Sequence, residues 1–539
     1  MMLRNAIQLQ TARRTVATSQ QPDPAGSIAD IIDDLDSAFL TLPKREAAAR
    51  LTKVYFQFAN SSQPVLFEPT FHSHLDSLYS LPMTIDLGRS HDTKDIQLTV
   101  FVVLEVFAVA LLVLQKQDPS KMSTSLPDRY HRVALMALDH TGLPPGIQGV
   151  QFLLLESQYC YHHSETLTVW STVGAALRLA VEIGLHKDPI EEMSATDLDV
   201  RRRVFWTAYA MDRNISIARN LPTCLADGAI SVEFPSVLSD NVIAKQKPGE
   251  SAQQNIDGAD SNTSKAKLVC LHVLRWRRLQ SEMQTVLHQQ APLGYAPIDI
   301  ERWQHDAQHR IMEWYKDLPR TSTFDPNERR IIENFDLTYH RAMLYLYQPS
   351  PNWLNPTEAA WLKILDAAEN MVRLYRKFFE EKRFTIYWQA VEGLSAAGTA
   401  LLNAYSRSSS VKERITLSVL RELVQTCSNV LWGMVSLFPS FKARRESFDE
   451  YVAAKLQELE ATPSKDSDIP PGISFEHHHV NAVDPFTTGL LPPDDHVDSG
   501  AMPVQPDDNV MHDWTDFEQA AFDWDALDNT VDFIPDTWN

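Results

Sequence analysis

The stretch VWSTVGAALRLAVEIGL, residues 169–185, shows the pattern that decides the fold class. Its apolar side chains recur at spacings of four, three and three, which places them in one stripe along an α-helix. The residues of this stripe are Val173, Leu177, Ala180 and Ile183. Gly184 stands where a helix often ends in a left-handed residue, and Pro189 prevents its continuation. The stretch therefore predicts an amphipathic helix packed against a core.

The same helical period continues through most of the chain. The helix after this one begins at SATDLDV, where Ser194 can cap the helix and Asp197 follows three residues later. Alternating strand patterns are scarce, and the 539 residues contain only 17 glycines. We therefore expect an all-α fold, a large helical array over residues 27–460.

Composition divides the rest of the chain. We expect a disordered lead-in at residues 1–26, although its three arginines and lack of acids before Asp23 are also typical of mitochondrial presequences. Residues 239–264 contain few apolar side chains and predict a disordered surface loop. Residues 461–510 are rich in Pro, Asp and Ser and predict a disordered linker. Residues 511–539 form a separate acidic and aromatic segment.

The charge is concentrated at the C-terminal end. The formal net charge is −21, and 17 acidic residues with no basic one follow Lys465. The rest of the chain is therefore close to neutral. Such a chain is a poor direct ligand for nucleic-acid phosphates unless a basic module lies elsewhere.

One apolar run could be mistaken for a membrane span. LTVFVVLEVFAVALLVL, residues 98–114, is 17 residues long and has Glu105 at its centre. A span needs about 20 apolar residues, and a carboxylate at the bilayer centre costs about 3 kcal/mol. The run therefore predicts a buried core helix.

No pattern indicates catalysis or metal binding. The chain lacks the common phosphate-binding, nucleophile-elbow and zinc-protease motifs, so we expect no catalytic, cofactor-binding or metal-binding residues and no enzyme. His162 and His163 are adjacent, face different ways on a helix, and are interpreted as residues of its polar face. The four cysteines lie far apart and are interpreted as small buried hydrophobes: Cys160, Cys224, Cys270 and Cys427.

Residues 200–235, VRRRVFWTAYAMDRNISIARNLPTCLADGAISVEFP, resemble the signature of the fungal-specific transcription factor domain. This is the middle homology region of zinc binuclear cluster regulators. The signature falls on Arg201, Arg202, Arg203, Phe205, Trp206, Tyr209, Asp212, Arg213 and Pro222, with Met211, Ser216, Asp227, Ile230 and Pro235 beside them. One departure is visible, because the family usually has Gly-Arg-Pro where this chain has Asn220, Leu221 and Pro222.

Further segments between residues 45 and 455 are similar to the same family, among them VYFQFANSSQPVLFEPTF at 54–71. The resemblance implies a nuclear regulator of RNA polymerase II genes, specific to a pathway of nutrient utilisation or secondary metabolism. It implies a regulatory or dimerising module without catalytic residues. Two alternatives stay open: a co-regulator that binds no DNA and acts on a zinc-cluster partner, or a helical enzyme or small-molecule binder.

The signature residues also have a purely structural interpretation. The aromatic residues Phe205, Trp206 and Tyr209 would pack their helix into the array. The charged residues would form ion pairs at its edges, and the run Arg201–Arg203 would be a solvated face. No bound ligand is needed for this interpretation.

Family members usually begin with six cysteines that bind two zinc ions and read DNA. The four cysteines here do not have that spacing. We expect zinc only if such a cluster precedes this chain, and a truncated gene model, an alternative start or DNA contact through a partner would each explain the sequence.

The segment DWTDFEQAAFDWDALDNTVDFIPDTWN, residues 513–539, combines six aromatic residues with eight acidic ones. Phe517, Ala520, Trp524, Leu527 and Val531 would share one face of a nascent helix. This acidic and hydrophobic alternation is typical of activation domains, which dock on coactivators. The predicted contacts are Trp514, Phe517, Phe522, Trp524, Leu527 and Phe533. The alternative is that the segment docks on the helical body of its own chain.

Overall fold

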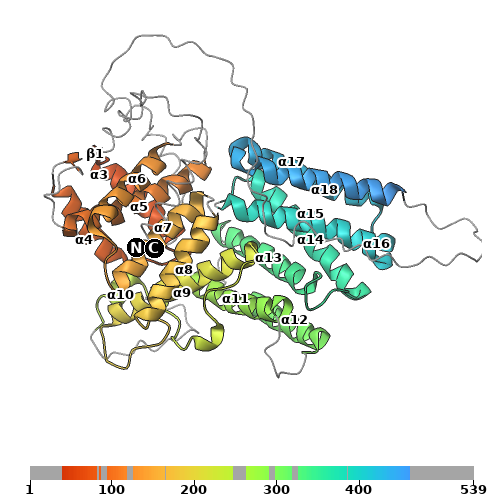
Figure 1. Cartoon of the computed structure of the whole chain (residues 1–539), viewed down its shortest axis with the longest axis horizontal. Helices are drawn as coiled ribbons and strands as arrows, with labels where there is room; N and C mark the ends of the chain where they lie inside the picture. Colours follow the sequence, from red (N-terminus) through yellow and green to blue (C-terminus); the bar gives the residue numbers. More distant parts are fainter. Residues whose placement is uncertain are drawn as a thin grey trace, which may run out of the picture. The chain divides into compact units, whose positions relative to one another are not determined.

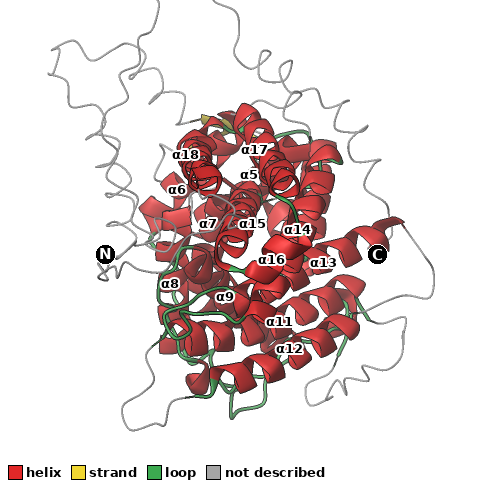
Figure 2. Ribbon diagram, turned by 90° about the vertical axis from the view of Figure 1, so that its right-hand side faces the viewer, coloured by secondary structure: helices red, strands yellow, loops and turns green. Residues whose placement is uncertain are grey.

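The computed structural model is almost entirely helical in the part of the chain that it describes (Figure 2), which confirms the all-α prediction. The described residues are 39–81, 84–86, 94–117, 125–163, 166–246, 263–289, 298–318, 326–384 and 386–461. Within them one short antiparallel sheet pairs β1 (Phe39–Thr41) with β2 (Thr84–Asp86). The predicted lead-in, linker and acidic segment lie outside the described residues.

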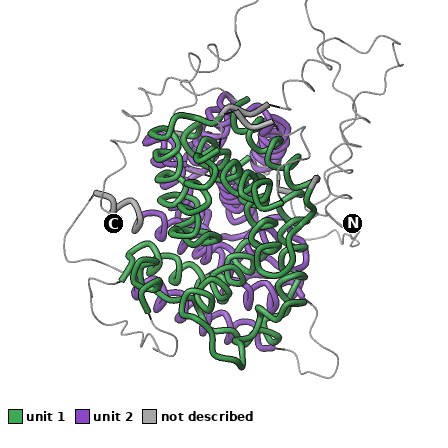
Figure 3. Tube along the Cα trace, turned by 90° about the vertical axis from the view of Figure 1, so that its left-hand side faces the viewer, with its two compact units in different colours: residues 1–212, 224–278, 522–539 green, residues 213–223, 279–521 purple. Residues whose placement is uncertain are grey.

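The described residues form two compact units (Figure 3). Unit 1 runs to Asp212 and includes Cys224–Arg278, whereas unit 2 comprises Arg213–Thr223 and the described residues from Leu279 onward. The elements that begin in unit 1 are β1, α3 (Arg45–Val54), the π-helix η1 (Tyr55–Ala59), α4 (Glu68–Tyr79), β2, α5 (Lys94–Gln117), α6 (Ser125–Thr141), α7 (Ile147–His163), α8 (Thr166–Glu182), α9 (Ala195–Ala218), η2 (Asp227–Ala229), α10 (Asp240–Ile243) and α11 (Lys265–His288).

Helix α5 is the core helix of unit 1, packed against α3, α6 and α7. By length and composition α5 could cross a membrane, but 83% of its apolar window is buried inside the protein. Glu105 is fully buried at its centre, and His131 Nδ1 of α6 lies 2.7 Å from its carboxylate. The prediction of a buried core helix is therefore confirmed, and the histidine supplies the polar partner that a buried carboxylate requires.

Helices α8 and α9 begin and end as their sequences predict. Gly184 adopts φ +76°, and the N–H of Leu185 donates to the carbonyl of Ala180, which ends α8 in a Schellman motif. Ser194 Oγ accepts from the N–H of Asp197 and donates to its carboxylate, so the two residues form a capping pair at the start of α9.

Unit 2 is a helical array in which successive long helices pack on one another (Figure 1). Its elements after α11 are α12 (Ile300–Lys316), α13 (Pro326–Tyr347), α14 (Glu358–Glu380), α15 (Tyr387–Arg407), α16 (Ser409–Arg414), α17 (Leu417–Leu437), η3 (Pro439–Phe441) and α18 (Lys442–Ala461). Side chains of Asp299, Thr357, Ser408 and Thr416 cap four of these helices. Helix α14 packs on α13, α15 and α17, and α18 packs on α15 and α17.

The segment predicted to be a surface loop, residues 239–264, is ordered at its beginning. Residues 240–243 form α10, and Ile243 is buried. Residues 247–262 lie outside the described residues. The composition of this segment gave no indication of α10, because a four-residue helix contains too little of the helical period to be recognised.

Candidate functional site: a buried charge cluster on the signature helix

The turn at residues 60–67 of unit 1 is stabilised mainly by hydrogen bonds from side chains to its backbone, rather than by the regular backbone hydrogen bonds of a helix or sheet. It follows the π-helix η1 and contains Pro64, which has no N–H to donate. Asn60 is buried at its start, and its side-chain oxygen accepts from the N–H groups of Val65 and Leu66, both at 2.9 Å. Its Nδ2 donates to the carbonyl of Leu66 at 3.1 Å.

The carbonyls of this turn accept hydrogen bonds from two other helices. Each of residues 63–66 receives one side-chain donor from α7 or α9, at 2.8–3.3 Å. The donors, in the order of the carbonyls, are Gln158, Thr207, Gln151 and Arg203. Because a buried carbonyl without a partner costs free energy, the turn depends on these donors.

Arg203 connects the turn to a cluster of charges. Its side chain is only 2% exposed. The guanidinium donates to Asp199 one helical turn earlier, to Asp240 of α10 at 2.7 Å, and to the carbonyl of Leu66 at 3.3 Å. The prediction that the basic run of the signature is a solvated face is therefore wrong for Arg203. A buried guanidinium is retained here because several acceptors surround it.

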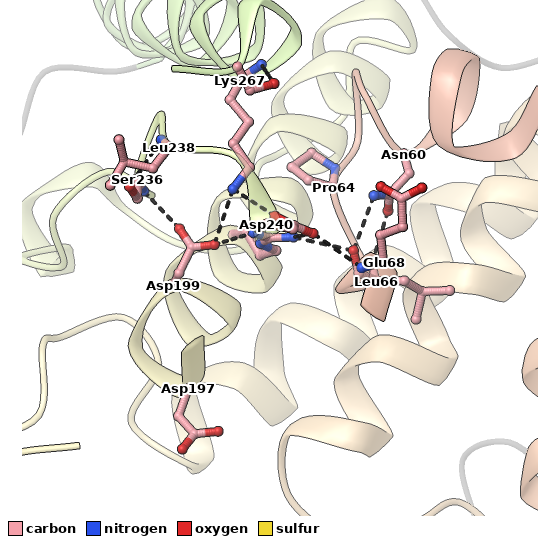
Figure 4. Close-up of polar contacts among 12 residues, drawn as sticks. Asn60, Pro64, Leu66, Glu68, Asp197, Asp199, Ser236, Leu238, Asp240 and Lys267 are labelled. Atoms are coloured by element: carbon pink, nitrogen blue, oxygen red, sulfur yellow. Dashed lines mark hydrogen bonds and ion pairs between the residues drawn. The ribbon is translucent and has the colours of Figure 1, made fainter. Parts of the chain in front are cut away.

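Lys267 of α11 completes the cluster. Its Nζ lies 2.8 Å from Asp240 and 3.6 Å from Asp199. In Figure 4 Lys267, Asp199 and Asp240 point towards one another from three separate elements. We call Asp199, Arg203, Asp240 and Lys267 the charge cluster. It contains two cations and two anions, so its formal net charge is zero.

Asp240 is the member of the charge cluster with partners from the most elements. Besides Arg203 and Lys267, its carboxylate accepts from the backbone N–H of Glu68 at the start of α4, at 3.1 Å. Asp199 similarly accepts from the N–H of Ser236 at 2.8 Å. Through these two carboxylates the cluster ties α4, α9, α10 and α11 and the chain before α10 to one point.

The electrostatics of the cluster favour the charged forms of Asp240 and Arg203 and disfavour that of Lys267. Burial alone would raise the pKa of Asp240, but the charge and hydrogen bonds of Arg203, with Lys267 beside it, hold that pKa well below its usual range. Burial lowers the pKa of Lys267, and the like charge of Arg203 lowers it further, against the two aspartates. For Arg203 burial is outweighed by Asp199 and Asp240, so its pKa is raised.

The other two arginines of the signature have separate partners. Arg202 forms a two-pronged pair with Asp188, at 2.8 and 3.0 Å, and a second pair with Glu233 at 2.9 Å. Its side chain is 15% exposed. Arg201 donates to the carbonyl of Gly184 at 3.4 Å. The three consecutive arginines therefore bind three different parts of unit 1 rather than forming one basic patch.

The aromatic residues of the signature pack as their structural interpretation expects. Phe205, Trp206 and Tyr209 are all buried. Trp206 packs against Phe234 with ring centroids 4.4 Å apart and ring planes tilted by 36°, and it donates from Nε1 to the carbonyl of Glu233 at 2.8 Å. The hydroxyl of Tyr209 lies 3.0 Å from the carboxylate of Asp227. The tail of the signature, from 227 to 234, is thus fixed to α9 by its own aromatics.

The Asp-Arg pair of the signature is buried, not at an edge. Asp212 is fully buried and accepts from the N–H of Cys224 at 3.2 Å. Arg213, assigned to unit 2, is also fully buried and donates from Nε to Ser281 at 3.1 Å. The expectation that these charges lie at the edges of the helix is therefore wrong, because their partners are inside the protein.

Asn220 explains how this chain tolerates its departure from the family pattern. Its φ is +50°, in the left-handed region, and the N–H of Leu221 donates to the carbonyl of Ser216 at 2.7 Å. This is the helix-ending position that favours glycine, and asparagine is among the few other residues that adopt it. Pro222 follows, and its carbonyl accepts from Ser216 Oγ at 3.3 Å.

The remaining sequence-selected residues lie apart from the cluster. His162 is buried in α7, so its interpretation as a polar-face residue is wrong, whereas His163 is partly exposed beside Asp128 at 3.3 Å. Cys160, Cys270 and Cys427 are buried as predicted, and Cys224 is half-buried. The described residues contain no group of three or more His, Cys, Asp or Glu that could hold a metal ion. The acidic segment and its six predicted contacts lie outside the described residues.

Sequence reasoning missed Asn60, Asp240 and Lys267. Asp240 and Lys267 are 37 and 64 residues beyond Arg203, in segments without a helical stripe that would place them near α9. For Asn60 the sequence does contain a signal. Within the 54–71 segment, Asn60 begins a short polar run that ends at Pro64, and such a run indicates a turn.

The region that contains the charge cluster also matches a known protein family. Residues 52–316 match the family described as "Fungal specific transcription factor domain", a range that includes the turn and the whole charge cluster. This part of the chain is a fungal-specific transcription factor domain.

Three curated relatives carry regulatory names. The chain is 25% identical to the Positive regulator of purine utilization of Emericella nidulans, over 77% of this chain and 47% of the relative. It is 27% identical to the Pyrimidine pathway regulatory protein 1 of Saccharomyces cerevisiae, over 48% and 30%. It is 22% identical to the Transcriptional activator protein acu-15 of Neurospora crassa, over 67% and 38%. The chain spans about half or less of the length of these relatives.

Proposed function

We propose that this chain belongs to a pathway-specific activator of RNA polymerase II genes that acts in the nucleus. The observation that carries the proposal is the transcription factor domain at 52–316, in a chain whose relatives are named as regulators of purine and pyrimidine pathways and as a transcriptional activator. These names favour nutrient utilisation over secondary metabolism as the class of target genes.

The chemistry of the signature supports a regulatory rather than an enzymatic role. Arg203 is buried and paired with Asp199 and Asp240, and Arg202, Asp212 and Arg213 each have partners within the protein. The cluster can position helices, but it leaves no reactive group for a substrate. We therefore propose that the domain acts by conformation and contact with partners.

We assign activation to the segment 511–539. Its aromatic residues bury apolar surface only when a partner supplies a groove, and its carboxylates keep it soluble until then. The partners proposed are transcription coactivators, with Trp524 and Leu527 on the contacting face. We propose that DNA is contacted by a zinc-cluster module or a zinc-cluster partner and not by the residues of this chain.

The experiment is a reporter assay with the chain fused to a heterologous DNA-binding domain. Truncation after Pro506 removes the acidic segment and should abolish activation. The double substitution Trp524→Ala and Leu527→Ala should do the same while every carboxylate stays in place, with protein levels matched by immunoblot. Full activation by the truncated chain would refute the assignment.

The mode of DNA contact has its own test. Sequencing the 5′ end of the transcript against the genomic sequence before Met1 distinguishes the two sources. An in-frame exon with six cysteines at the zinc-cluster spacing would place DNA reading in the same polypeptide. A message that begins at Met1 would assign it to a partner.

A further inference from the structure

A second polar network of unit 1 lies between α5, α6 and α7. It begins at Glu105, which is fully buried in the middle of α5. Oε1 of this carboxyl group lies 2.7 Å from Nδ1 of His131 of α6, whose side chain is 12% exposed. Oε2 has no hydrogen-bond partner in the part of the chain that the structure describes. The buried carboxyl group therefore depends on one imidazole.

Stacked aromatic rings continue the network from α6 to α7. The ring of His131 lies on that of Tyr159 of α7, with centroids 3.6 Å apart and planes 9° apart. One turn later, His163 stacks on the same tyrosine at 5.4 Å. The hydroxyl of Tyr159 donates to Asp128 of α6 at 2.6 Å, and Nε2 of His163 lies 3.3 Å from Asp128. We call Glu105, Asp128, His131, Tyr159 and His163 the proton network.

Two members of the proton network keep their charge state around neutral pH. Burial would raise the pKa of Asp128, but hydrogen bonds from His163 and Tyr159 hold it below its usual range, so Asp128 stays ionised. Burial, with the hydrogen bond to Asp128, raises the pKa of Tyr159, so its hydroxyl stays a neutral donor. The charge of the network therefore changes through Glu105 and the two imidazoles, and imidazole is the group that normally titrates between about pH 5 and pH 8.

Each element packed on α5 presents its own groups to it. The buried residues of α3 do not titrate. Helix α4 presents His74, which lies 3.3 Å from Thr99, more than one turn before Glu105. Burial raises the pKa of Tyr55 of η1, and the charge of Glu105 adds to this effect, so Tyr55 stays neutral. Further charged or titratable groups within one turn of the network on α6 and α7 are Arg129, Tyr130, Arg132, Glu156, Cys160 and His162.

The pair of Glu105 and His131 has zero net charge only while it holds one proton, whichever of the two groups carries it. Loss of that proton leaves a fully buried carboxylate beside a neutral imidazole, and an uncompensated buried charge is strongly destabilising. Loss of a proton from His163 matters less, because His163 and Asp128 are 36% and 44% exposed. The packing of α7 on α5 and α6 should therefore weaken as pH rises.

Helix α7 connects the proton network to the turn at 60–67. Gln158, next to Tyr159, accepts from the hydroxyl of Tyr55 at 2.9 Å and donates to the carbonyl of Gln63 at 2.8 Å. Gln151 of the same helix donates to the carbonyl of residue 65 at 2.9 Å. A change in the packing of α7 therefore reaches the backbone that precedes α4.

We propose that the proton network is a pH-sensitive device in unit 1. It fixes α7 on α5 and α6 while Glu105 and His131 share a proton, and it loosens α7, and with it the turn at 60–67, when that proton is lost at higher pH. The proposal concerns the packing of unit 1 and does not rest on the proposed function.

Hydrogen exchange of the full chain, measured by mass spectrometry at about pH 6.5 and about pH 8.5, tests the device. Protection factors correct for the intrinsic pH dependence of amide exchange. Linkage to one proton changes an opening equilibrium by at most about ten-fold per pH unit, so peptides from α5 and α7 should be about ten-fold less protected at the higher pH. Peptides from α14 of unit 2 are the internal reference and should keep their protection.

The variant Glu105→Gln keeps the size of the side chain and an oxygen that accepts from His131. It removes the carboxylate, so a charged imidazole at the lower pH lacks its counter-charge. The pH dependence should reverse, with α5 and α7 at least as protected at the higher pH as at the lower. The double variant Glu105→Gln, His131→Gln pairs two amides that do not titrate. It should show equal protection at both pH values, and it decides the test should the single variant not fold.

Glu156→Gln and His162→Gln are the matched controls, because each removes a buried titratable group of α7 outside the proton network. Both should keep the wild-type loss of protection, which would support the proposal. Equal protection of the wild type at the two pH values would overturn it. A wild-type loss that persists in the double variant, or one that either control abolishes, would overturn it as well.

Discussion

Arg203 of α9 and Arg376 of α14 are both helical arginines paired with an acidic residue four positions away, but one pair is buried and the other is exposed. Arg203 is 2% exposed and reaches Asp199, Asp240 and a backbone carbonyl. Arg376 is 61% exposed, and the described residues give it the single partner Glu380. The pair of Arg203 connects separate elements of unit 1, whereas the pair of Arg376 lies on the surface of a single helix. Burial and the number of distant partners, not spacing in the sequence, separate them.

The largest expected effect is at Arg203. Arg203→Ala removes one donor from Asp199, from Asp240 and from the carbonyl of Leu66, and breaking a buried ion pair on one side costs about 3–5 kcal/mol. Urea unfolding of the full chain, followed by circular dichroism, should show the transition of unit 1 at lower denaturant. A midpoint equal to that of the wild type would mean that the cluster contributes nothing to stability.

Asn60 should come next, because it makes three hydrogen bonds within one turn. Asn60→Ala leaves two buried N–H groups without acceptors, and we expect a loss of about 2–3 kcal/mol. Asn60→Asp is the informative companion, since it keeps the acceptor for Val65 and Leu66 but removes the donor to the carbonyl. In the same urea unfolding measurement, Asn60→Asp should therefore lose less free energy of unfolding than Asn60→Ala. An equal loss from both would contradict the assigned roles of the amide.

The pKa of Asp240 predicts a pH dependence. That pKa is lowered in the folded state, so the stabilisation is fully present above the unfolded value of about 3.9 and is lost as pH falls through the folded value. Between pH 4 and pH 2 the wild type should lose stability more steeply than Asp240→Asn, by up to about 1.4 kcal/mol per pH unit. Parallel curves for the two proteins would show that Asp240 does not titrate in this way.

The smallest effect on stability is expected at Arg376. Arg376→Ala removes an exposed pair and should leave the unfolding temperature almost unchanged. Thermal unfolding at two salt concentrations is sufficient, because any contribution should fall as salt screens it. A fall in unfolding temperature as large as that of Arg203→Ala would place Arg376 in the same class as Arg203 and remove the basis of the comparison.

The elements with a strong period could be predicted from the sequence, and the charge cluster could not. The apolar run around Glu105, the end of α8 at Gly184 and the cap of α9 at Ser194 are each encoded within a few residues. Burial of a charge is different, because it depends on partners that the chain brings together only after folding. Nothing near Arg203 indicates that Asp240 and Lys267 will meet it.

The same reason explains the error at residues 239–246. Composition marked them as a loop because polar residues dominate there. One of those polar residues, Asp240, is the acceptor for Arg203, Lys267 and the backbone of α4. A segment poor in apolar side chains can therefore be ordered when one carboxylate accepts from several donors and one apolar side chain, here Ile243, is buried.

A double-mutant cycle between Arg203 and Asp240 tests most directly whether the cluster holds the signature helix to its neighbours. Arg203→Met, Asp240→Asn and the double variant would be compared by urea unfolding of the full chain. If the two side chains stabilise the fold through each other, the coupling free energy should be about 2–3 kcal/mol, with the double variant less destabilised than the sum of the singles. A coupling below about 0.5 kcal/mol would mean that the two residues act independently, and it would contradict the account.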